Sequence, residues 1–334
     1  MSKNEITRVV GVDIGGTKLH AVVADEHGRV FGRARKKVGR DTSFAAVMER
    51  VDKLVREACA EANIGLEAVT AIGVGAPSPV LPNGTAINAP NLGWSQVPLG
   101  PTLTQLFRRP CFGANDCDAG TLGEYAFGAA RGARTAVGLF MGTGLGGGIV
   151  LEGQIHSGDN YKAAEIGHMV VVKDGRRCGC GHRGCLEAYA SKSGMARRFE
   201  KELREKDRKT VLSELCGGDF AQLRSSDLAQ AYGAGDELAV EALHEAAEYL
   251  GVGVANLITL LGPSVVVLGG GVLSALGEAL FDRICSSARA LTWPPSSFED
   301  TSIRLATLGD DAVALGAVAW ALRKHQAPAP PAPA

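Results

Sequence analysis

The stretch AEIGHMVVVKDGRRCGCGHRGCLEAYAS, residues 164–191, places three cysteines and a histidine within a short span of chain. Thiolate and imidazole ligands, separated by glycines that let the backbone fold inward, are typical of tetrahedral Zn²⁺. Because four protein ligands leave no open position for an activated water, we expect a structural zinc that supports a loop. Spacing alone is equally compatible with a zinc knuckle that only staples this loop. The predicted ligands are His168, Cys178, Cys180 and Cys185.

Two acidic residues, Glu165 and Glu187, accompany this metal-ligand set. The second ring nitrogen of His168 can hydrogen-bond a ligand or a neighbouring group while the first binds the metal. The motif EIGH followed by CGCGxxGCLE resembles the signature of the ROK family of sugar kinases, and of its glucokinase-like members in particular. The resemblance implies that Glu165, His168 and Glu187 hold sugar hydroxyls and that the cysteines bind zinc.

The chain has 334 residues, enough for two domains. Its 35 Lys and Arg residues nearly balance 36 Asp and Glu residues, which favours small-molecule chemistry and gives no sign of a nucleic-acid or membrane partner. The start, MSKNEITRVVGV, lacks the apolar region of a signal peptide, and no uncharged apolar run is long enough to span a membrane, so we expect a cytoplasmic protein. The eight cysteines are too sparse for a disulfide scaffold, and those outside the metal set are expected to be reduced.

Residues 8–24, RVVGVDIGGTKLHAVVA, are typical of two apolar strands around a Gly-Gly turn. The glycines permit positive φ, so successive backbone N–H groups can point at an anion, while threonine and lysine add a hydroxyl and a charge. The aspartate that ends the first strand could hold Mg²⁺ directly or through water. The alternative is an ordinary hairpin with a buried aspartate, but the segment also matches the DxGGTK phosphate motif of the actin-like sugar kinase superfamily. The residues concerned are Asp13, Gly15, Gly16, Thr17 and Lys18.

Residues 135–152, TAVGLFMGTGLGGGIVLE, form a second glycine-rich hairpin. Its glycines spell GxGxxG but lead into a strand, whereas a dinucleotide fingerprint opens a helix, and no Walker A lysine is present. The segment from Val137 aligns without gaps with the segment from Val10, at an offset of 127 residues, which predicts two similar halves. Phe140 replaces Asp13, so only the first half should carry a metal-facing carboxylate. The expected phosphate contacts are Gly142, Thr143, Gly144, Gly146 and Gly147.

The loop APSPVLPNGTAINAPNLGW, residues 76–94, contains amides and an aromatic ring suited to a sugar. Asn88 and Asn91 could bind hydroxyls and Trp94 could supply a packing face, although turn formation is the commoner role of such residues. The matching loop of the family reaches the sugar, which favours Asn91. The family usually has glycine at the place of Ser78 and an acid where this chain has Leu81, so the substrate preference stays open.

Residues 108–128, RRPCFGANDCDAGTLGEYAFG, predict a strand that ends at Asn115 and Asp116, followed by a helix of small residues. Asp116 could simply be the helix N-cap. A carboxylate at a strand tip, beside an amide, can also accept the proton of an attacking sugar hydroxyl. The pair matches the catalytic aspartate and the sugar-binding asparagine of the family, so we expect Asp116 as general base and Asn115 as a sugar ligand.

The later segments supply mainly scaffold. Lys- and Glu-rich helices between about 187 and 230 indicate a solvated surface, and a helical apolar stripe over residues 240–261 indicates a buried spine. SVVVLGGGV, residues 264–272, predicts a buried strand, a glycine turn and a helix whose N-terminus can approach a nucleotide. The family uses this turn on the adenosine side, which implicates Gly270 and Gly271. The tail HQAPAPPAPA is expected to be disordered or extended.

The alternation of strands and helices, with two related halves, predicts an α/β protein of two ribonuclease-H-like (actin-like) domains flanking a central cleft. We expect a smaller domain over 1–117, completed by a C-terminal helix at about 311–324, a larger domain with the zinc loop over 118–310, and a tail over 325–334. The motifs of the ROK resemblance occur in order and extend to about residue 324.

Together with these residues, the ROK resemblance implies an ATP- and Mg²⁺-dependent hexose kinase, above all a glucokinase acting on the 6-hydroxyl. An N-acetylglucosamine, N-acetylmannosamine, mannose or fructose kinase stays open, because residues that hold hydroxyls do not exclude an acetamido group. A sugar-sensing regulator is the alternative from another class. Family regulators carry an N-terminal helix-turn-helix, and only about seven residues precede the first strand here, which argues against DNA binding. The resemblance also implies a homodimer or homotetramer.

Overall fold

Two five-stranded sheets organise residues 7–326, the part of the chain that the computed structural model describes. Each sheet belongs to its own α/β unit with its own apolar core. Unit 1 comprises the described residues up to Gly132, Ile155–Ala163 and the described residues from Asp310. Unit 2 comprises Ala133–Gln154 and Ala164–Gly309.

The sheet of unit 1 has the strand order β3-β2-β1-β4-β7. β1 pairs antiparallel with β2 and parallel with β4, and β4 continues the parallel arrangement with β7. A separate antiparallel pair, β5 (Ala86–Ala89) and β6 (Trp94–Val97), lies in the loop after β4. The sheet strands are β1 (Val9–Ile14), β2 (Lys18–Ala24), β3 (Val30–Lys37), β4 (Ala71–Ala76) and β7 (Cys111–Asn115).

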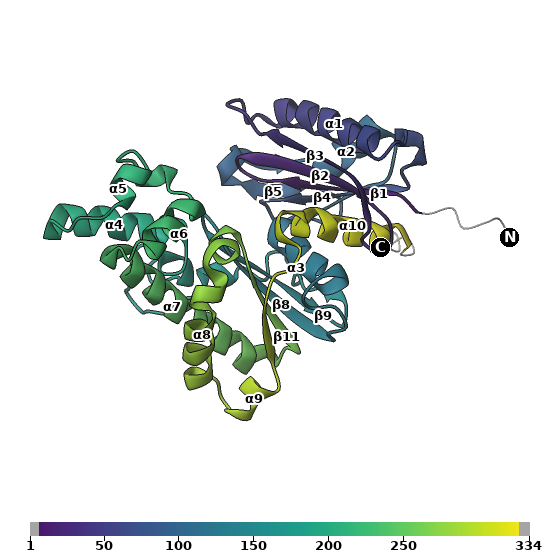
Figure 1. Cartoon of the computed structure of the whole chain (residues 1–334). Helices are drawn as coiled ribbons and strands as arrows, with labels where there is room; N and C mark the ends of the chain where they lie inside the picture. The colour runs from purple at the N-terminus through teal and green to yellow at the C-terminus, as the bar shows by residue number, and fades with distance from the viewer. Residues whose placement is uncertain (1–6, 327–334) are drawn as a thin grey trace. The chain divides into compact units, whose positions relative to one another are not determined.

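Helices cover both faces of this sheet (Figure 1). α1 (Phe44–Glu61) and α2 (Leu99–Phe107) lie on one face, and α3 (Asp116–Phe127) and α10 (Ala312–Gln326) lie on the other. Two strand glycines let α10 approach closely: a Cβ on Gly11 would lie 1.9 Å from the carbonyl oxygen of Ala314, and one on Gly73 would lie 1.8 Å from that of Ala317. No larger residue fits at either position.

The sheet of unit 2 repeats this topology with the order β10-β9-β8-β11-β12. β8 pairs antiparallel with β9 and parallel with β11, which pairs parallel with β12. The two similar halves predicted from the sequence are therefore present as two sheets of matching strand order. The strands are β8 (Thr135–Met141), β9 (Leu145–Leu151), β10 (Gln154–Ile155), β11 (Val265–Gly269) and β12 (Ser302–Leu305).

The gapless alignment of the two hairpins is wrong beyond the turn. Ile14 pairs with Leu19, so residues 15–18 form the first turn, whereas Met141 pairs with Leu145, so residues 142–144 form the second. The second turn is one residue shorter, and the strand that follows it shifts by one position relative to the first hairpin.

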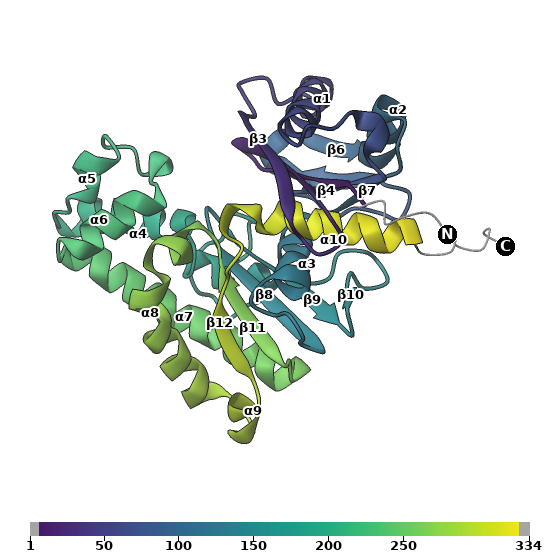
Figure 2. The same cartoon turned by 45° about the vertical axis from the view of Figure 1, so that its right-hand side comes forward.

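Helices α7 (Glu237–Leu261) and α8 (Gly271–Leu291) pack together in unit 2 (Figure 2). α7 is the predicted buried spine, and its buried side chains include Leu243, Leu250 and Val254. The segment expected to be solvated surface contributes more than surface, because α4 also buries Met195 and Phe199 in the core. The remaining helices are α4 (Lys192–Lys206), α5 (Leu212–Leu215), α6 (Ser225–Gly233) and α9 (Ser296–Glu299).

The unit boundaries differ from the expected ones. All of α3 lies in unit 1, because it packs along α10, and Ile155–Ala163 also joins that unit. His325 and Gln326, expected in the tail, belong to α10, while residues 327–334 lie outside the described residues. Among residues 7–326, no helix is both long and apolar enough to cross a membrane.

Candidate active site

The carboxyl ends of three parallel strands meet at one edge of the unit 1 sheet. Asp13 of β1 pairs with Gly75 of β4, and the next residue of β4, Ala76, pairs with Asn115 of β7. Asp116 follows directly as the first residue of α3, and a Cβ on Gly75 would lie 3.6 Å from its Cα. The fold therefore gathers Asp13, Asn115 and Asp116, which are distant in sequence, at a single sheet edge.

Asn115, and not Asp116, is the N-cap of α3. The Oδ1 atom of Asn115 accepts hydrogen bonds from the backbone N–H groups of Cys117 at 2.9 Å and Asp118 at 3.2 Å. Asp116 Oδ1 accepts from Cys117 N at 2.8 Å. Because capping uses the Oδ1 end of the Asn115 amide, its Nδ2 end is the part suited to donate to a ligand.

The β1–β2 turn exposes Gly16, Thr17 and Lys18. It is closed by a hydrogen bond from Gly15 N to Lys18 O at 3.0 Å. Neither Gly15 nor Gly16 has a positive φ, so the expected reason for these glycines is wrong. The Gly15 N–H is used in the bond that closes the turn, whereas the exposed Gly16 has no side chain to cover its backbone N–H from an anion. A Cβ on Gly16 would lie 3.6 Å from Cβ of Asn91, which places the predicted sugar-binding asparagine beside this turn.

Asp13 experiences strong electrostatic strain. Burial, together with repulsion from the nearby carboxylates of Asp116 and Asp310, raises the pKa of Asp13 to about 7. A carboxylate repelled by like charges fits a divalent cation, which would offset both effects. These carboxylates are not gathered as tightly as a set of direct metal ligands, since the one such cluster in residues 7–326 is the Cys/His set of unit 2. Mg²⁺ held here would keep much of its water shell.

In the loop after β4, the expected role of Trp94 is wrong, and the serine at position 78 has a structural role. Trp94 is a core residue: its Nε1 donates to Thr42 O at 2.8 Å, and its ring meets Phe44 edge-on at 5.2 Å. It is therefore unavailable as a packing face for a sugar. Ser78 is buried, and its Oγ accepts from Asn88 N at 3.0 Å, so this departure from the family's glycine fixes the loop.

In unit 2, the EIGH motif lies on the β8–β9 hairpin. His168 ends a short 3₁₀ turn, Ile166–His168, that follows the exposed Glu165. A Cβ on Gly167 would lie 1.9 Å from Leu145 O, so this glycine is what lets the turn reach the hairpin. Glu187 reaches the same place, because its Oε2 accepts from Leu145 N at 3.1 Å.

The hairpin turn is also held by residues that the sequence reasoning missed. The backbone N–H groups of Lys192 and Ser193, at the start of α4, donate to Gly142 O at 3.1 Å and Thr143 O at 3.0 Å. Ser191 caps this helix by accepting from Gly194 N at 3.0 Å. The sequence did contain one signal for the start of this helix, because Ser191 is a typical N-cap residue and precedes a helical segment.

Gly270 is the first glycine of the predicted nucleotide turn, and it lies against the base of the β8–β9 hairpin. Its φ is 88°, and a Cβ would lie 2.5 Å from Met141 N. Gly271 begins α8 immediately after it. The helix N-terminus and the glycine hairpin therefore share one edge of the unit 2 sheet, where both present backbone N–H groups suited to anions.

The predicted zinc ligands converge. The ligand atoms of His168, Cys178, Cys180 and Cys185 all lie within 4.8 Å of one another. The Cys180 and Cys185 sulfurs are 3.8 Å apart, as are Cys178 Sγ and His168 Nδ1. A tetrahedral site with Zn–S bonds of about 2.3 Å requires sulfur separations of about 3.8 Å, so the set fits Zn²⁺.

The ligand cluster also touches a predicted sugar ligand. His168 faces the thiols with Nδ1, which leaves Nε2 on the opposite side of the ring. Cys178 Sγ donates to Glu187 Oε1 at 3.3 Å. Burial and the side-chain hydrogen bonds to Cys180 and Glu187 raise the pKa of Cys178 to about 12, and a metal bound here would displace this proton. The zinc ligands and Glu187 form one connected group with the hairpin.

The fold is that of the actin-like ATPases, because the chain is similar to solved structures that have this fold. A ROK family glucokinase from Streptomyces griseus, solved in complex with glucose and AMPPNP, matches with a TM-score of 0.82 and 33% identity, over 95% of this chain and 99% of that chain. The ROK family profile matches residues 9–324. The chain belongs to the ROK family, as the sequence motifs predicted.

Curated relatives carry the name glucokinase. The glucokinase of Streptomyces coelicolor is 35% identical over 92% of this chain and 95% of its own length. The glucokinase of Thermotoga maritima is also 35% identical, over 93% of this chain and 96% of its own length. The similarity therefore covers both units, and the predicted α/β actin-like fold class is confirmed.

Proposed function

We propose that this chain is an ATP-dependent hexose kinase, with glucose as its substrate, that transfers the γ-phosphoryl group to the sugar's 6-hydroxyl. The observation that carries the proposal is the position of Asp116 at the strand edge it shares with Asp13, beside an exposed glycine turn. Relatives named glucokinase, and a similar structure with glucose and AMPPNP, support it.

Asp116 is proposed as the general base that accepts the proton of the attacking hydroxyl. The Nδ2 group of Asn115 and the amide of Asn91 would bind other hydroxyls of the sugar. Asp13 would hold Mg²⁺, which neutralises charge on the transferring phosphates, and residues 15–18 would contact those phosphates.

Unit 2 would bind the rest of the substrates. Glu165, His168 and Glu187 would orient the sugar through its hydroxyls. A bound metal would take the place of the Cys178 proton, so that Glu187 Oε1 would be able to accept from a sugar hydroxyl instead. A structural Zn²⁺ would fix this arrangement. The proposed nucleotide contacts are Gly142, Thr143, Gly144, Gly146, Gly147, Gly270 and Gly271.

The proposal is tested by a hexose panel with ATP and Mg²⁺, read by ADP release. Glucose, N-acetylglucosamine, N-acetylmannosamine, mannose and fructose are compared at equal concentrations with zinc-replete protein. Turnover with glucose well above the others supports the glucokinase. A preference for another sugar would support the kinase activity but identify a different substrate. No turnover with any sugar, with ATP or with polyphosphate as donor, overturns the kinase in favour of a sugar-sensing regulator.

Two finer parts of the proposal have separate tests. A homodimer or homotetramer is expected from the family resemblance, and light scattering after gel filtration measures the mass directly. Use of ATP is compatible with action in the cytoplasm, which fractionation of the native host would test.

A further inference from the structure

The zinc loop, residues 168–185, is held together internally by its ligands and by its own backbone. Val171 N donates to Gly184 O and Cys178 N donates to His182 O, both at 2.8 Å. These bonds and a bound metal determine the shape of the loop. They do not determine how the loop is oriented on the rest of unit 2, which requires contacts that leave the loop.

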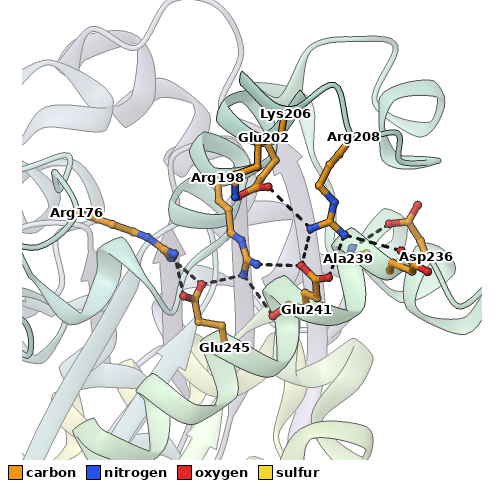
Figure 3. Close-up of polar contacts among 10 residues, drawn as sticks. Arg176, Arg198, Glu202, Lys206, Arg208, Asp236, Ala239, Glu241 and Glu245 are labelled. Carbon is orange, nitrogen blue, oxygen red and sulfur yellow. Dashed lines mark hydrogen bonds and ion pairs between the residues drawn. The ribbon is translucent and has the colours of Figure 1, made fainter. Parts of the chain in front are cut away.

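One external contact is an ion-pair clamp on α7 (Figure 3). The guanidinium of Arg176, within the zinc loop, donates from Nη1 to Glu245 Oε2 and from Nη2 to Glu245 Oε1, each at 2.8 Å. Arg198 of α4 donates to the same carboxylate at 2.9 Å. The two-pronged geometry fixes direction as well as distance, which a single hydrogen bond would not do.

A second external contact uses the same arginine. Arg176 N donates to the hydroxyl oxygen of Tyr189 at 2.8 Å, and its guanidinium lies 4.8 Å from the centre of that ring. The Tyr189 ring stacks on Tyr249 of α7, with centroids 4.1 Å apart. Tyr189 is buried and follows Glu187 by two residues, so it ties the loop, α7 and a proposed sugar ligand together.

We propose that Arg176 and Tyr189 are positioning residues, which orient the zinc loop on α7 so that His168 and Glu187 are aligned for the sugar. The proposal rests on the proposed function. Zinc keeps the loop folded, and the clamp keeps the folded loop in place. Removing the Arg176 side chain should therefore leave the metal bound and weaken sugar binding.

The same helix offers a matched control. Arg208 pairs with Glu241 of α7 in the same two-pronged way, at 2.6 and 3.0 Å, but it belongs to the segment after α4 (Figure 3). Arg176→Ala and Arg208→Ala each remove one arginine pair from α7. If the Arg176 pair only stabilised the fold, the two substitutions would have similar effects.

The experiment compares both variants with wild-type protein by zinc content, calorimetric titration with glucose, and the KM values for glucose and ATP. We expect Arg176→Ala to keep one zinc per chain and its KM for ATP, and to bind glucose about tenfold more weakly. Arg208→Ala should bind glucose as wild type does. Arg176→Lys keeps the positive charge but loses the two-pronged guanidinium contact, so its glucose affinity should lie between those of wild type and Arg176→Ala.

Tyr189→Phe keeps the ring stack but removes the hydroxyl, and it carries the test if Arg176→Ala does not fold. A smaller loss of glucose affinity with zinc retained supports the proposal. Equal glucose affinity in the Arg176 and Arg208 variants, or loss of zinc from the Arg176 variant, would overturn it. Wild-type protein that neither binds nor phosphorylates a hexose would instead overturn the proposed function.

Discussion

The β1–β2 and β8–β9 hairpins occupy equivalent places in two sheets of the same strand order, yet their side chains differ in kind. Asp13 pairs with Gly75 of the neighbouring parallel strand, and at the equivalent position Phe140 pairs with Gly269. Unit 1 thus places a carboxylate where unit 2 places an aromatic ring. Under the proposed function, the repeated backbone provides two phosphate-binding turns, while the magnesium ligand and the general base belong to unit 1 alone.

The two turns also differ in support. The first turn has residues 16–18 exposed and accepts one hydrogen bond from Val38 N at Thr17 O, whereas the second turn is held by two backbone bonds from the start of α4 and by the side chain of Glu187. Changes in unit 1 are therefore expected to act mainly on chemistry and charge. Changes in unit 2 are expected to act mainly on packing and sugar affinity.

The largest effect is expected from Asp116→Asn, which removes the proposed base of unit 1. Turnover should fall at least about a hundredfold, because an amide cannot accept the hydroxyl proton. Glucose binding should change little, since the side chain keeps its size and its backbone contact. Steady-state kinetics and calorimetric titration measure the two quantities, and unchanged turnover would remove Asp116 from the mechanism.

Zinc removal tests the contribution of unit 2. Chelation should weaken glucose binding by about tenfold or more, because His168 loses its fixed position and the Cys178 thiol regains the proton that bonds it to Glu187 Oε1. ATP affinity should change less. Titration calorimetry before chelation, after it and after zinc is restored measures the effect. An apo protein with unaltered glucose affinity would show that the zinc loop is independent of the sugar site.

Glycine-to-alanine changes compare the turns directly. A Cβ at Gly144 would lie 2.4 Å from Glu187 Oε2, whereas a Cβ at Gly16 would meet nothing closer than Asn91 Cβ at 3.6 Å. Gly144→Ala should displace the Glu187 carboxylate from Leu145 N and cost about 1 kcal/mol of stability, the typical net contribution of one hydrogen bond. Gly16→Ala should change stability by less than about 0.5 kcal/mol. Equal denaturant midpoints for the two variants would contradict the difference in support.

The smallest expected effect is a pH-dependent increase in the stability of the folded protein on Asp13→Asn substitution. Because the folded-state pKa of Asp13 is about 7, against 3.8 for an unperturbed aspartate, the unfolded chain releases this proton first as pH rises. Asp13 therefore lowers stability between about pH 4 and pH 7, and the loss persists above that range. In magnesium-free buffer, the asparagine variant should be more stable by about 1–2 kcal/mol at pH 8 and equal to wild type at pH 4. Equal stability at both pH values would show that Asp13 is not electrostatically strained.

Motifs that are contiguous in sequence could be located without a structure. Asp13, Asn115 and Asp116 end predicted strands, and the internal repeat indicated that two sheets would share a topology. The repeat did not reveal that the second turn is one residue shorter, because glycine-rich sequence aligns equally well in either register.

Contacts between distant segments could not be predicted in the same way. Lys192 and Ser193 act through backbone amides, which have no side-chain signature. Arg176 and Glu245 lie far apart in sequence, and any surface arginine and glutamate could have formed such a pair. The predicted domain boundary at residue 117 left most of α3 outside unit 1. The helix that α3 packs against, α10, lies almost at the end of the described chain, so no nearby sequence indicated this contact.

The packing of α10 on Gly11 and Gly73 has a consequence for synthesis of the chain on the ribosome. Synthesis of unit 1 begins before that of unit 2. The face of β1 and β4 that α10 covers nevertheless stays exposed until residues 312–326 have emerged from the ribosome. Unit 2 ends at Gly309, so its core can close earlier. The part of the protein translated first is thus completed last. In a circular permutant with α10 placed before β1, this face of the sheet could be covered as soon as β1 and β4 have emerged.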